Sequence, residues 1–384
     1  MSNLSSLVTV DEGESMSAPT SSAAGAEGIT PVWLTEVLQR GGYLGVGDAV
    51  AGVTATRIGS GQLGATYLLD LVYASGGQVG RSPMPARIIA KVPAIDEASR
   101  AFAASLGCYR REVAFYSTIA ADLPIRTPEC YHASVSADGL EFCLLLEDLT
   151  PASEASQLTG CGVEHAASAL DQAAALHAGS WRDPDLSGVD WLAGGVQVWQ
   201  QMCAGLPQAQ VAFRERYADL LDDTTVRVAE SLADGAAARW AERLAEPRCL
   251  WHSDFRLDNL LFDARGGEVP VAVLDWQSVT LASGPVDASY FIGAGLTTGT
   301  RRAHETDLLH GYHEALVRGG VSDYSWEDCL AEYRVNSLAG FVISVVAALG
   351  TERSPEADAI FTTMAARHAA HIDDCDAVAL VAAR

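Results

Sequence analysis

The amino-acid sequence predicts an α+β protein of two lobes, with a small antiparallel sheet over residues 29–148 and a larger, mainly helical part over 149–384. Strand-like apolar segments around a glycine-rich turn predict the sheet. The second part is rich in aromatic and aliphatic residues, and a polar motif of Asp254, Asn259 and Asp275 interrupts it. With 384 residues, 49% of them apolar, the chain can bury a large core, which we expect to form around one cleft.

The N-terminal segment differs in composition from the rest of the chain. Residues 1–28 are rich in Ser, Ala, Gly and Glu and lack a basic start followed by an apolar core, so they do not resemble a secretory signal. We expect a disordered tail there. A capping hydroxyl at Thr30 and a proline at Pro31 then predict the start of an amphipathic helix that continues through Leu38.

A glycine-rich turn follows between two strand-like segments, Val53–Ile58 and Ala65–Tyr73. A dinucleotide-binding loop would open a helix instead, and a Walker loop would require Gly-Lys-Ser/Thr, which this segment lacks. The order strand, glycine loop, strand is typical of kinases, although a plain hairpin turn would have the same pattern. The loop residues that we expect at a nucleotide are Gly59, Ser60, Gly61, Gln62 and Gly64.

The next apolar strand, Arg87–Val92, carries Lys91, a residue type that steadies nucleotide phosphates. The alternative is a lysine in solvent at a strand end. A helix expected over residues 99–116 places Glu112 where it could pair with Lys91, and Glu97 is the second candidate for that pairing.

A buried strand is expected over Phe142–Leu146. It leads into Glu147 and Leu149, at the point where a connector between the two lobes begins. We expect backbone groups of this connector to bind adenine.

The polar motif supplies the side chains that phosphoryl transfer needs. Asp254 can orient and deprotonate an acceptor hydroxyl, while Asn259 and Asp275 can hold magnesium against the phosphates. Each fragment alone is weak evidence, since an aspartate after a strand is often a turn or cap residue. The strands Leu260–Phe262 and Val269–Leu274 can form a hairpin that brings Asn259 and Asp275 together at its open end.

Together these residues resemble the kinase-like phosphotransferases that include aminoglycoside phosphotransferases, choline kinases and ecdysteroid kinase-like proteins. The resemblance covers nearly everything after Ile29, and it implies a bilobal protein-kinase-like fold with ATP and Mg²⁺ as cofactors. It is closest to the ecdysteroid kinase-like and bacterial "phosphotransferase family" branch. The segments that carry this closer resemblance are Gly61–Tyr67, Leu176–Ala178 with Trp181, Phe255–Asn259, Asp275–Gln277 and Gly284–Asp287.

The resemblance also implies roles for single residues. Asp254 is implied as the catalytic base, and Asn259 and Asp275 as the magnesium ligands. Lys91 and Glu112 are implied as the ion pair that positions the phosphates.

Three further residues of the motif region have implied roles. Arg256 lies where protein kinases usually carry a lysine that neutralises the transferred phosphate, and the alternative is a surface arginine paired with Asp258. His252 and Asp287 are expected to brace the catalytic loop by hydrogen bonds.

The sequence departs from protein kinases in two ways. Ser253 occupies the position of an arginine that senses a phosphorylated activation loop, and the related phosphotransferases usually have glycine there. Only residues 276–286 separate Asp275 from Asp287, which is too short for a regulatory loop and a peptide-docking platform. We therefore expect a small-molecule hydroxyl acceptor and no regulation by such phosphorylation.

Charge and cysteine content limit the partners and the location. The formal net charge of −24 comes from 49 acidic and 25 basic side chains, which disfavours nucleic acid and anionic membranes as partners. The eight cysteines are scattered without a Cys-x-x-Cys pair, so we expect reduced thiols in the cytoplasm and no zinc site. The apolar run Leu338–Leu349 is too short to span a bilayer, so we expect a buried helix and no membrane insertion.

Three hypotheses for function remain open. The first is a magnesium- and ATP-dependent kinase of a bulky apolar alcohol, steroid-like or hydroxyacyl, because aromatic residues recur after residue 150. The second is an aminoglycoside or other antibiotic O-phosphotransferase. The third is a nucleotide-binding pseudokinase that acts as a sensor or scaffold, although such a protein has no chemical need for Asp254. A hydrolase is not indicated, since the sequence lacks a Gly-x-Ser-x-Gly elbow and a His-Glu-x-x-His helix.

Overall fold

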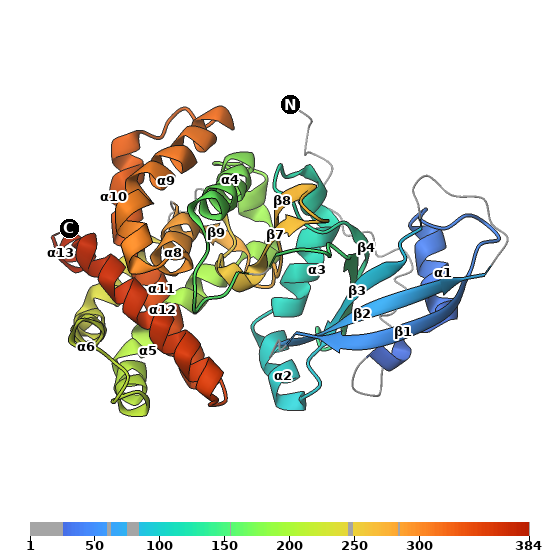
Figure 1. The fold of residues 1–384 in the computed structure, drawn as a ribbon, viewed down its shortest axis with the longest axis horizontal. Helices are drawn as coiled ribbons and strands as arrows, with labels where there is room; N and C mark the ends of the chain where they lie inside the picture. The colour runs from blue at the N-terminus through green and yellow to red at the C-terminus, as the bar shows by residue number, and fades with distance from the viewer. Residues whose placement is uncertain are drawn as a thin grey trace. The chain divides into compact units, whose positions relative to one another are not determined.

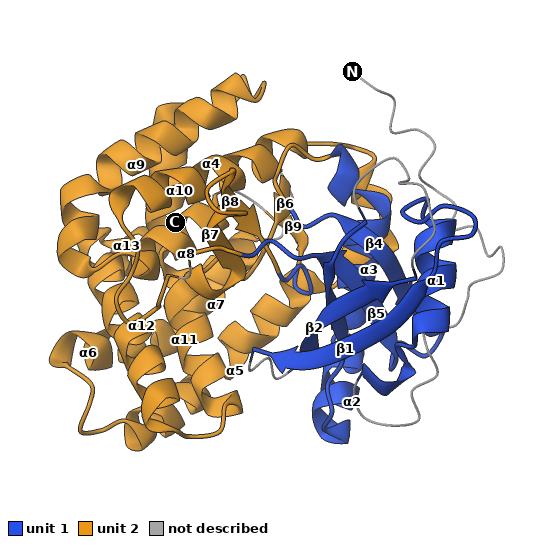
Figure 2. Ribbon diagram, turned by 45° about the vertical axis from the view of Figure 1, so that its right-hand side comes forward, with its two compact units in different colours: residues 1–122, 127–150, 275–278 blue, residues 123–126, 151–274, 279–384 orange. Residues whose placement is uncertain are grey.

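A computed structural model of the chain describes residues 26–59, 63–74, 84–153, 155–244, 249–282 and 285–383 (Figure 1). The chain divides into two compact units, which Figure 2 shows in different colours. Unit 1 comprises residues 1–122, 127–150 and 275–278, and unit 2 comprises residues 123–126, 151–274 and 279–384. Unit 1 contains a five-stranded sheet, whereas unit 2 is mainly helical.

The first described residues lie against unit 1. Ala26–Gly28, which the composition placed in a disordered tail, form a 3₁₀ turn. The reason is Ile29, which is buried in the core and donates its N–H to the carbonyl of Ala26. Helix α1 (Pro31–Arg40) follows, and the side chain of Thr30 caps it by accepting the N–H of Trp33 over 3.2 Å, as the capping pattern predicts.

The sheet of unit 1 is antiparallel throughout, with strand order β1-β2-β3-β5-β4. Its strands are β1 (Val50–Ile58), β2 (Gly64–Tyr73), β3 (Arg87–Pro93), β4 (Cys130–Val135) and β5 (Phe142–Glu147). Helix α1 covers this sheet, because Leu34 and Leu38 share one core cluster with Leu69, Ile88 and Leu145. This shared core fixes the strand that carries Lys91.

The single helix expected over residues 99–116 is two helices, α2 (Glu97–Ser105) and α3 (Cys108–Thr118). Gly107 separates them with a φ of 72°, a left-handed conformation that glycine adopts without steric cost. After this break the apolar side chain of Phe102 on α2 is 57% exposed. Only α3 packs as expected.

The helices of unit 2 enclose its core. They are α4 (Val163–Gly179), α5 (Gly195–Arg216), α6 (Asp223–Ser231), α7 (Ala237–Arg243), α8 (Val286–Gly295), α9 (Thr298–Arg318), α10 (Trp326–Asn336), α11 (Leu338–Gly350), α12 (Pro355–Asp374) and α13 (Ala377–Ala382). Every residue of α8 is buried. Among the described residues, one helical stretch, Trp326–Gly350, is apolar and long enough to cross a bilayer, and 67% of its most apolar window is buried within the protein.

Two glycines allow helices of unit 2 to pack closely around His368 of α12. A Cβ atom on Gly340 of α11 would lie only 1.9 Å from Cε1 of His368. A Cβ atom on Gly293 of α8 would lie 2.5 Å from Nδ1 of the same ring. Since real contacts are longer, the imidazole occupies space that any larger residue at 293 or 340 would require.

Two short strand pairs of unit 2 flank Asp254 and Asn259. The predicted hairpin is present as β7 (Leu260–Ala264) and β8 (Val269–Val273), with Leu260 opposite Val273. A second pair, β6 (Cys249–Trp251) and β9 (Thr280–Ala282), carries the chain into and out of the region. Asn259 directly precedes β7, and Asp254 lies in the loop between β6 and β7.

Candidate active site

Lys91 lies between two carboxylates within unit 1. Its Nζ atom lies 2.6 Å from Oε1 of Glu112 on α3 and 2.8 Å from Oδ1 of Asp275. Glu112 is thus the partner of Lys91, and the second candidate, Glu97, begins helix α2 instead. The lysine is also not the solvent-exposed strand-end residue of the alternative interpretation, since its side chain is 16% exposed.

The charges around Lys91 keep its ammonium group protonated. Burial lowers the pKa of Lys91, but the negative charges of Asp275 and Glu112 more than offset this effect, so the pKa is raised. A fixed positive charge of this kind suits a nucleotide phosphate.

Helix α3 also holds the segment that carries Asp275. The ring of Trp276 stacks on Phe115 of α3, with centroids 3.9 Å apart. Arg111 of the same helix donates to the carbonyl oxygen of Gln277 over 3.1 Å. Asp275 itself has a φ of 63°, a left-handed conformation that costs energy for a residue with a side chain. The contacts on both following residues maintain this conformation.

The glycine-rich turn is described only at its two ends. Gly59 follows β1 with a φ of 69°, and Gly64 opens β2. A Cβ on Gly64 would lie 3.3 Å from the carbonyl oxygen of Val92, so this strand passes close to β3. Three predicted nucleotide-binding residues lie outside the described residues: Ser60, Gly61 and Gln62.

The proposed adenine connector follows β5. Glu147 ends this strand, and its side chain accepts the N–H of Glu129 over 3.1 Å. Asp148 pairs with Arg87 over 2.7 Å, and Leu149 is buried. These contacts fix the backbone of the connector, while its role towards adenine remains a prediction.

Within unit 2, three side chains surround the carboxylate of Asp254. Arg256 places Nε 3.0 Å from Oδ1, and Asn259 donates from Nδ2 to Oδ2 over 2.9 Å and to the backbone carbonyl over 2.8 Å. The Tyr290 hydroxyl donates to Oδ1 over 3.3 Å. Arg256 also pairs with Asp258, the contact of the alternative interpretation, while its role towards the transferred phosphate remains a prediction. Because Asn259 uses its amide nitrogen here, its carbonyl oxygen Oδ1 is the atom that could bind a cation.

Asp287 of α8 anchors the segment that leads to Asp254. Its carboxylate accepts the backbone N–H groups of His252, over 2.7 Å, and Ser253, over 3.1 Å. The ring of His177 lies 3.2 Å from Asp287 and 2.7 Å from the Tyr312 hydroxyl. Asp287 is fully buried, so hydrogen bonds shielded from solvent hold the loop in place.

His252 braces the same loop from its other side. Its Nε2 atom lies 2.9 Å from the carbonyl oxygen of Leu274, and the N–H of Asp254 lies 3.3 Å from its Nδ1. Leu274 in turn donates its N–H to the carbonyl of Asn259 over 2.9 Å. The bracing role of His252 remains a prediction, for which these contacts provide the support.

Sequence reasoning assigned no role to Tyr290 or to the His177 side chain. Tyr290 lies three residues after Asp287 on one helix, and this spacing puts both residues on the same face. This spacing from Asp287 is the sequence signal from which a role for Tyr290 could have been predicted. His177 has no comparable local signal, because its partners Asp287 and Tyr312 are far away in sequence.

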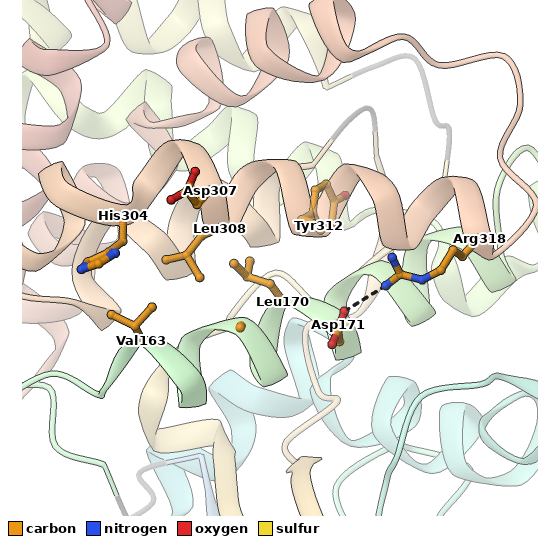
Figure 3. Close-up of a pocket in the computed structure, with 10 residues that line it drawn as sticks. Val163, Leu170, Asp171, His304, Asp307, Leu308, Tyr312 and Arg318 are labelled. Carbon is orange, nitrogen blue, oxygen red and sulfur yellow. Dashed lines mark ion pairs between the residues drawn. The ribbon is translucent and has the colours of Figure 1, made fainter.

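A surface pocket of about 420 Å³ lies between helices α4 and α9 of unit 2 (Figure 3). In Figure 3, Asp171 of α4 and Arg318 of α9 point towards one another, and their charged atoms are 3.6 Å apart. The residues that line this pocket are Val163, Ala167, Leu170, Asp171, His304, Asp307, Leu308, Gly311, Tyr312 and Arg318. This set contains none of the predicted catalytic or metal-binding residues.

Residues 55–319 match the model of the phosphotransferase enzyme family. A search of curated proteins yields no significant match.

Similar solved structures include three kinases of small molecules. Choline kinase from Cryptosporidium parvum is 11% identical, with a TM-score of 0.48 over 84% of this chain and 89% of that one. A microcompartment-associated aminopropanol kinase is 16% identical, with a TM-score of 0.46 over 90% and 99% of the two chains. An ADP-bound aminoglycoside phosphotransferase is 14% identical, with a TM-score of 0.45 over 83% and 95%.

Proposed function

The chain belongs to the phosphotransferase enzyme family, and we propose that it transfers the γ-phosphoryl group of ATP to a hydroxyl group of a small molecule. The observation that carries the proposal is the position of Lys91, whose Nζ lies 2.6 Å from Glu112 and 2.8 Å from Asp275. A half-buried cation with fixed partners is suited to orient the phosphates of a nucleotide.

Asp254 is the proposed catalytic base. Its carboxylate would accept the proton of the acceptor hydroxyl while that oxygen attacks the γ-phosphorus and the bond to the β-phosphate oxygen breaks. Hydrogen bonds from Asn259 and Tyr290 hold the carboxylate in one orientation. Arg256 provides a guanidinium group beside it, which would offset negative charge on the transferred group.

Asn259 and Asp275 are the proposed ligands of Mg²⁺. An amide oxygen and a carboxylate suit a hard divalent cation, which usually keeps several waters and binds through few protein groups. Held by these two residues, Mg²⁺ would supply positive charge that offsets the negative charge of the phosphates. Asp275 also contacts Lys91, so the same side chain would connect the metal with the phosphate-binding lysine.

For the acceptor, we propose a bulky apolar alcohol, steroid-like or hydroxyacyl. The support is the motif resemblance to the ecdysteroid kinase-like branch. The aromatic content adds little, because residues such as Trp199, Trp240 and Tyr333 are buried in the core. We place the reaction in the cytoplasm, a compartment in which the eight free cysteines would stay reduced.

The test compares wild type with Asp254→Asn. Each protein is incubated with magnesium-ATP and fractionated small-molecule extracts, and mass spectrometry detects species that gain one phosphoryl group. Asp254→Asn should bind nucleotide normally in calorimetry but lose transfer by several orders of magnitude. Asp258→Asn is the matched control, since it also removes a carboxylate next to Arg256 and should retain transfer.

A second variant separates binding from chemistry. Asp275→Ala should weaken the binding of magnesium-ATP itself, because it removes a metal ligand and a partner of Lys91. Equal transfer by wild type and Asp254→Asn would exclude the proposed mechanism. Normal nucleotide binding without any phosphorylated product across sterols, hydroxyacyl compounds and aminoglycosides would favour a nucleotide-binding pseudokinase.

A further inference from the structure

Three potential metal ligands meet in unit 2, apart from the residues discussed above. They are Glu305 of α9, His371 in the last turn of α12, and Cys375 directly after α12. One ligand atom of each residue lies within 4.8 Å of the ligand atoms of the other two. His371 and Cys375 are four residues apart, so a continuous helical turn puts them on one face.

The buried imidazole of His371 lacks a hydrogen-bond partner. Its side chain is 0% exposed, and within the described part of the chain neither ring nitrogen has a partner. The hydroxyl of Tyr333 is buried nearby without a partner as well. Glu305 and Cys375 are among the groups that raise the pKa of Tyr333, which places this hydroxyl beside the same cluster. Because unpaired buried polar atoms are costly, a bound group that they share would account for them.

Zinc binding would displace the thiol proton of Cys375 to solvent. A thiolate, a neutral imidazole and a carboxylate would then hold the ion.

The neighbouring ion pairs leave room for a cation. Arg301 pairs with Oε2 of Glu305, which leaves Oε1 for a metal ion. Asp374 pairs with both Arg301 and Arg302, so Glu305 and Asp374 together balance these two guanidinium groups. The Cys375 thiolate would offset one of the two charges of a bound divalent ion, which reduces the cost of burial.

We propose that Glu305, His371 and Cys375 bind a Zn²⁺ ion that ties α9 to the C-terminal end of α12. Thiolate, imidazole and carboxylate together select zinc over magnesium or calcium. Tetrahedral zinc bonds of about 2.0 to 2.3 Å would draw the three ligand atoms closer to one another. A water molecule completes the tetrahedron, and the Tyr333 hydroxyl can hydrogen bond to it.

This site was not expected from the cysteine pattern, which contains no Cys-x-x-Cys pair. The ligand spacing explains why, because Glu305 is distant in sequence from the His-x-x-x-Cys pair of residues 371–375. Its role is structural, and it stands independently of the proposed phosphoryl transfer.

The experiment measures zinc in the full-length protein, purified without metal-affinity chromatography and dialysed against a weak chelator. Elemental analysis should find one zinc per chain, and added Zn²⁺ should raise the melting temperature of the metal-stripped protein. Cobalt substitution should produce a thiolate-to-cobalt charge-transfer band, which reports directly on Cys375. Cys375→Ser should abolish the band and lower zinc affinity at least about tenfold.

Matched controls come from the same chain. Cys203→Ser changes a cysteine that is buried to the same 3% exposure, and it should keep the zinc and the cobalt band. His368→Asn changes the other fully buried histidine of α12 and should keep the zinc as well. If Cys375→Ser fails to fold, Glu305→Gln at the half-buried ligand is measured instead and should lower zinc affinity. The proposal would be overturned if wild type contained no zinc and its melting temperature did not change on zinc addition. Unaltered zinc binding by Cys375→Ser or Glu305→Gln would also overturn it.

Discussion

The hydroxyl of Tyr290 hydrogen bonds to Oδ1 of Asp254 over 3.3 Å. Tyr290 lies on α8, one turn after Asp287, whose carboxylate binds the backbone N–H groups of His252 and Ser253. One buried helix therefore fixes both the backbone before the proposed base and the carboxylate of the base itself. Tyr290 acts as a positioning residue.

We predict that Tyr290→Phe lowers kcat about tenfold, the effect of losing one hydrogen bond worth about 1.4 kcal/mol to the reacting carboxylate. The KM for ATP should not change, because the hydrogen bond of Tyr290 is to the proposed base and not to a residue proposed to bind nucleotide. Steady-state kinetics with an acceptor identified by the mass-spectrometric screen provide the measurement.

Tyr73→Phe is the control for Tyr290→Phe, since it removes a hydroxyl that bonds to the Pro85 carbonyl in unit 1. This control should keep the wild-type kcat. An equal fall in kcat for both variants would mean that the Tyr290 effect is a general loss of stability.

Glu112→Gln should raise the dissociation constant of ATP at least about tenfold, because it removes one of the two charges that hold Lys91. Isothermal calorimetry with magnesium-ATP measures the change. Glu97→Gln, at the other carboxylate considered as a partner, should bind ATP like wild type. Weaker binding in Glu97→Gln but not in Glu112→Gln would contradict the assignment of this ion pair.

Ser253→Gly should stabilise the protein by about 1 kcal/mol. Ser253 has a φ of 70°, which glycine adopts more easily, and its buried hydroxyl has no hydrogen-bond partner among the residues that the structure describes. Urea unfolding of wild type and variant measures the difference in the free energy of unfolding.

Ser253→Ala separates the two effects, because it removes the hydroxyl but keeps the unfavourable φ. The glycine variant should therefore be more stable than the alanine variant by about 1 kcal/mol. Equal stability of these two variants would show that backbone strain at residue 253 is small.

The stability of the chain should fall in acid partly because of His132. Burial and, to a smaller extent, Arg40 lower the pKa of His132 from 6.5 to about 4. The unfolded chain therefore takes up this proton at a higher pH than the folded chain. The contribution of His132 is fully present above pH 6.5 and is lost as the pH falls towards about 4, by up to about 1.4 kcal/mol per pH unit.

Urea unfolding at several pH values between 7 and 4 measures this contribution. In His132→Gln the free energy of unfolding should decrease less steeply with falling pH than in wild type. Identical slopes for the two proteins would show that His132 is not responsible. All other titrating groups are common to both proteins and cancel in the comparison.

Local sequence signals predicted most of the fold and of the proposed active site. The strand carrying Lys91, the hairpin after Asn259 and the capped helix at Thr30 follow from patterns within a few residues of each other. The pairing of Lys91 with Glu112 could be predicted because both lie on elements that the pattern identifies.

The features that the sequence did not predict depend on contacts between distant segments or on the backbone angles of single residues. The break between α2 and α3 comes from Gly107, and a glycine within a helical pattern is often tolerated. The cluster of Glu305, His371 and Cys375 forms only when α9 packs beside α12, and no local sequence pattern predicts that contact.

The close packing at His368 links the evolution of two positions. Because a Cβ at residue 340 would overlap the His368 ring, alanine at 340 is compatible only with a smaller side chain at 368. Homologous sequences should therefore vary at these positions as a pair, with a glycine at 340 wherever a large ring occupies 368. The same coupling limits protein engineering. A substitution at either position alone would lower stability, whereas a matched double substitution would avoid that loss.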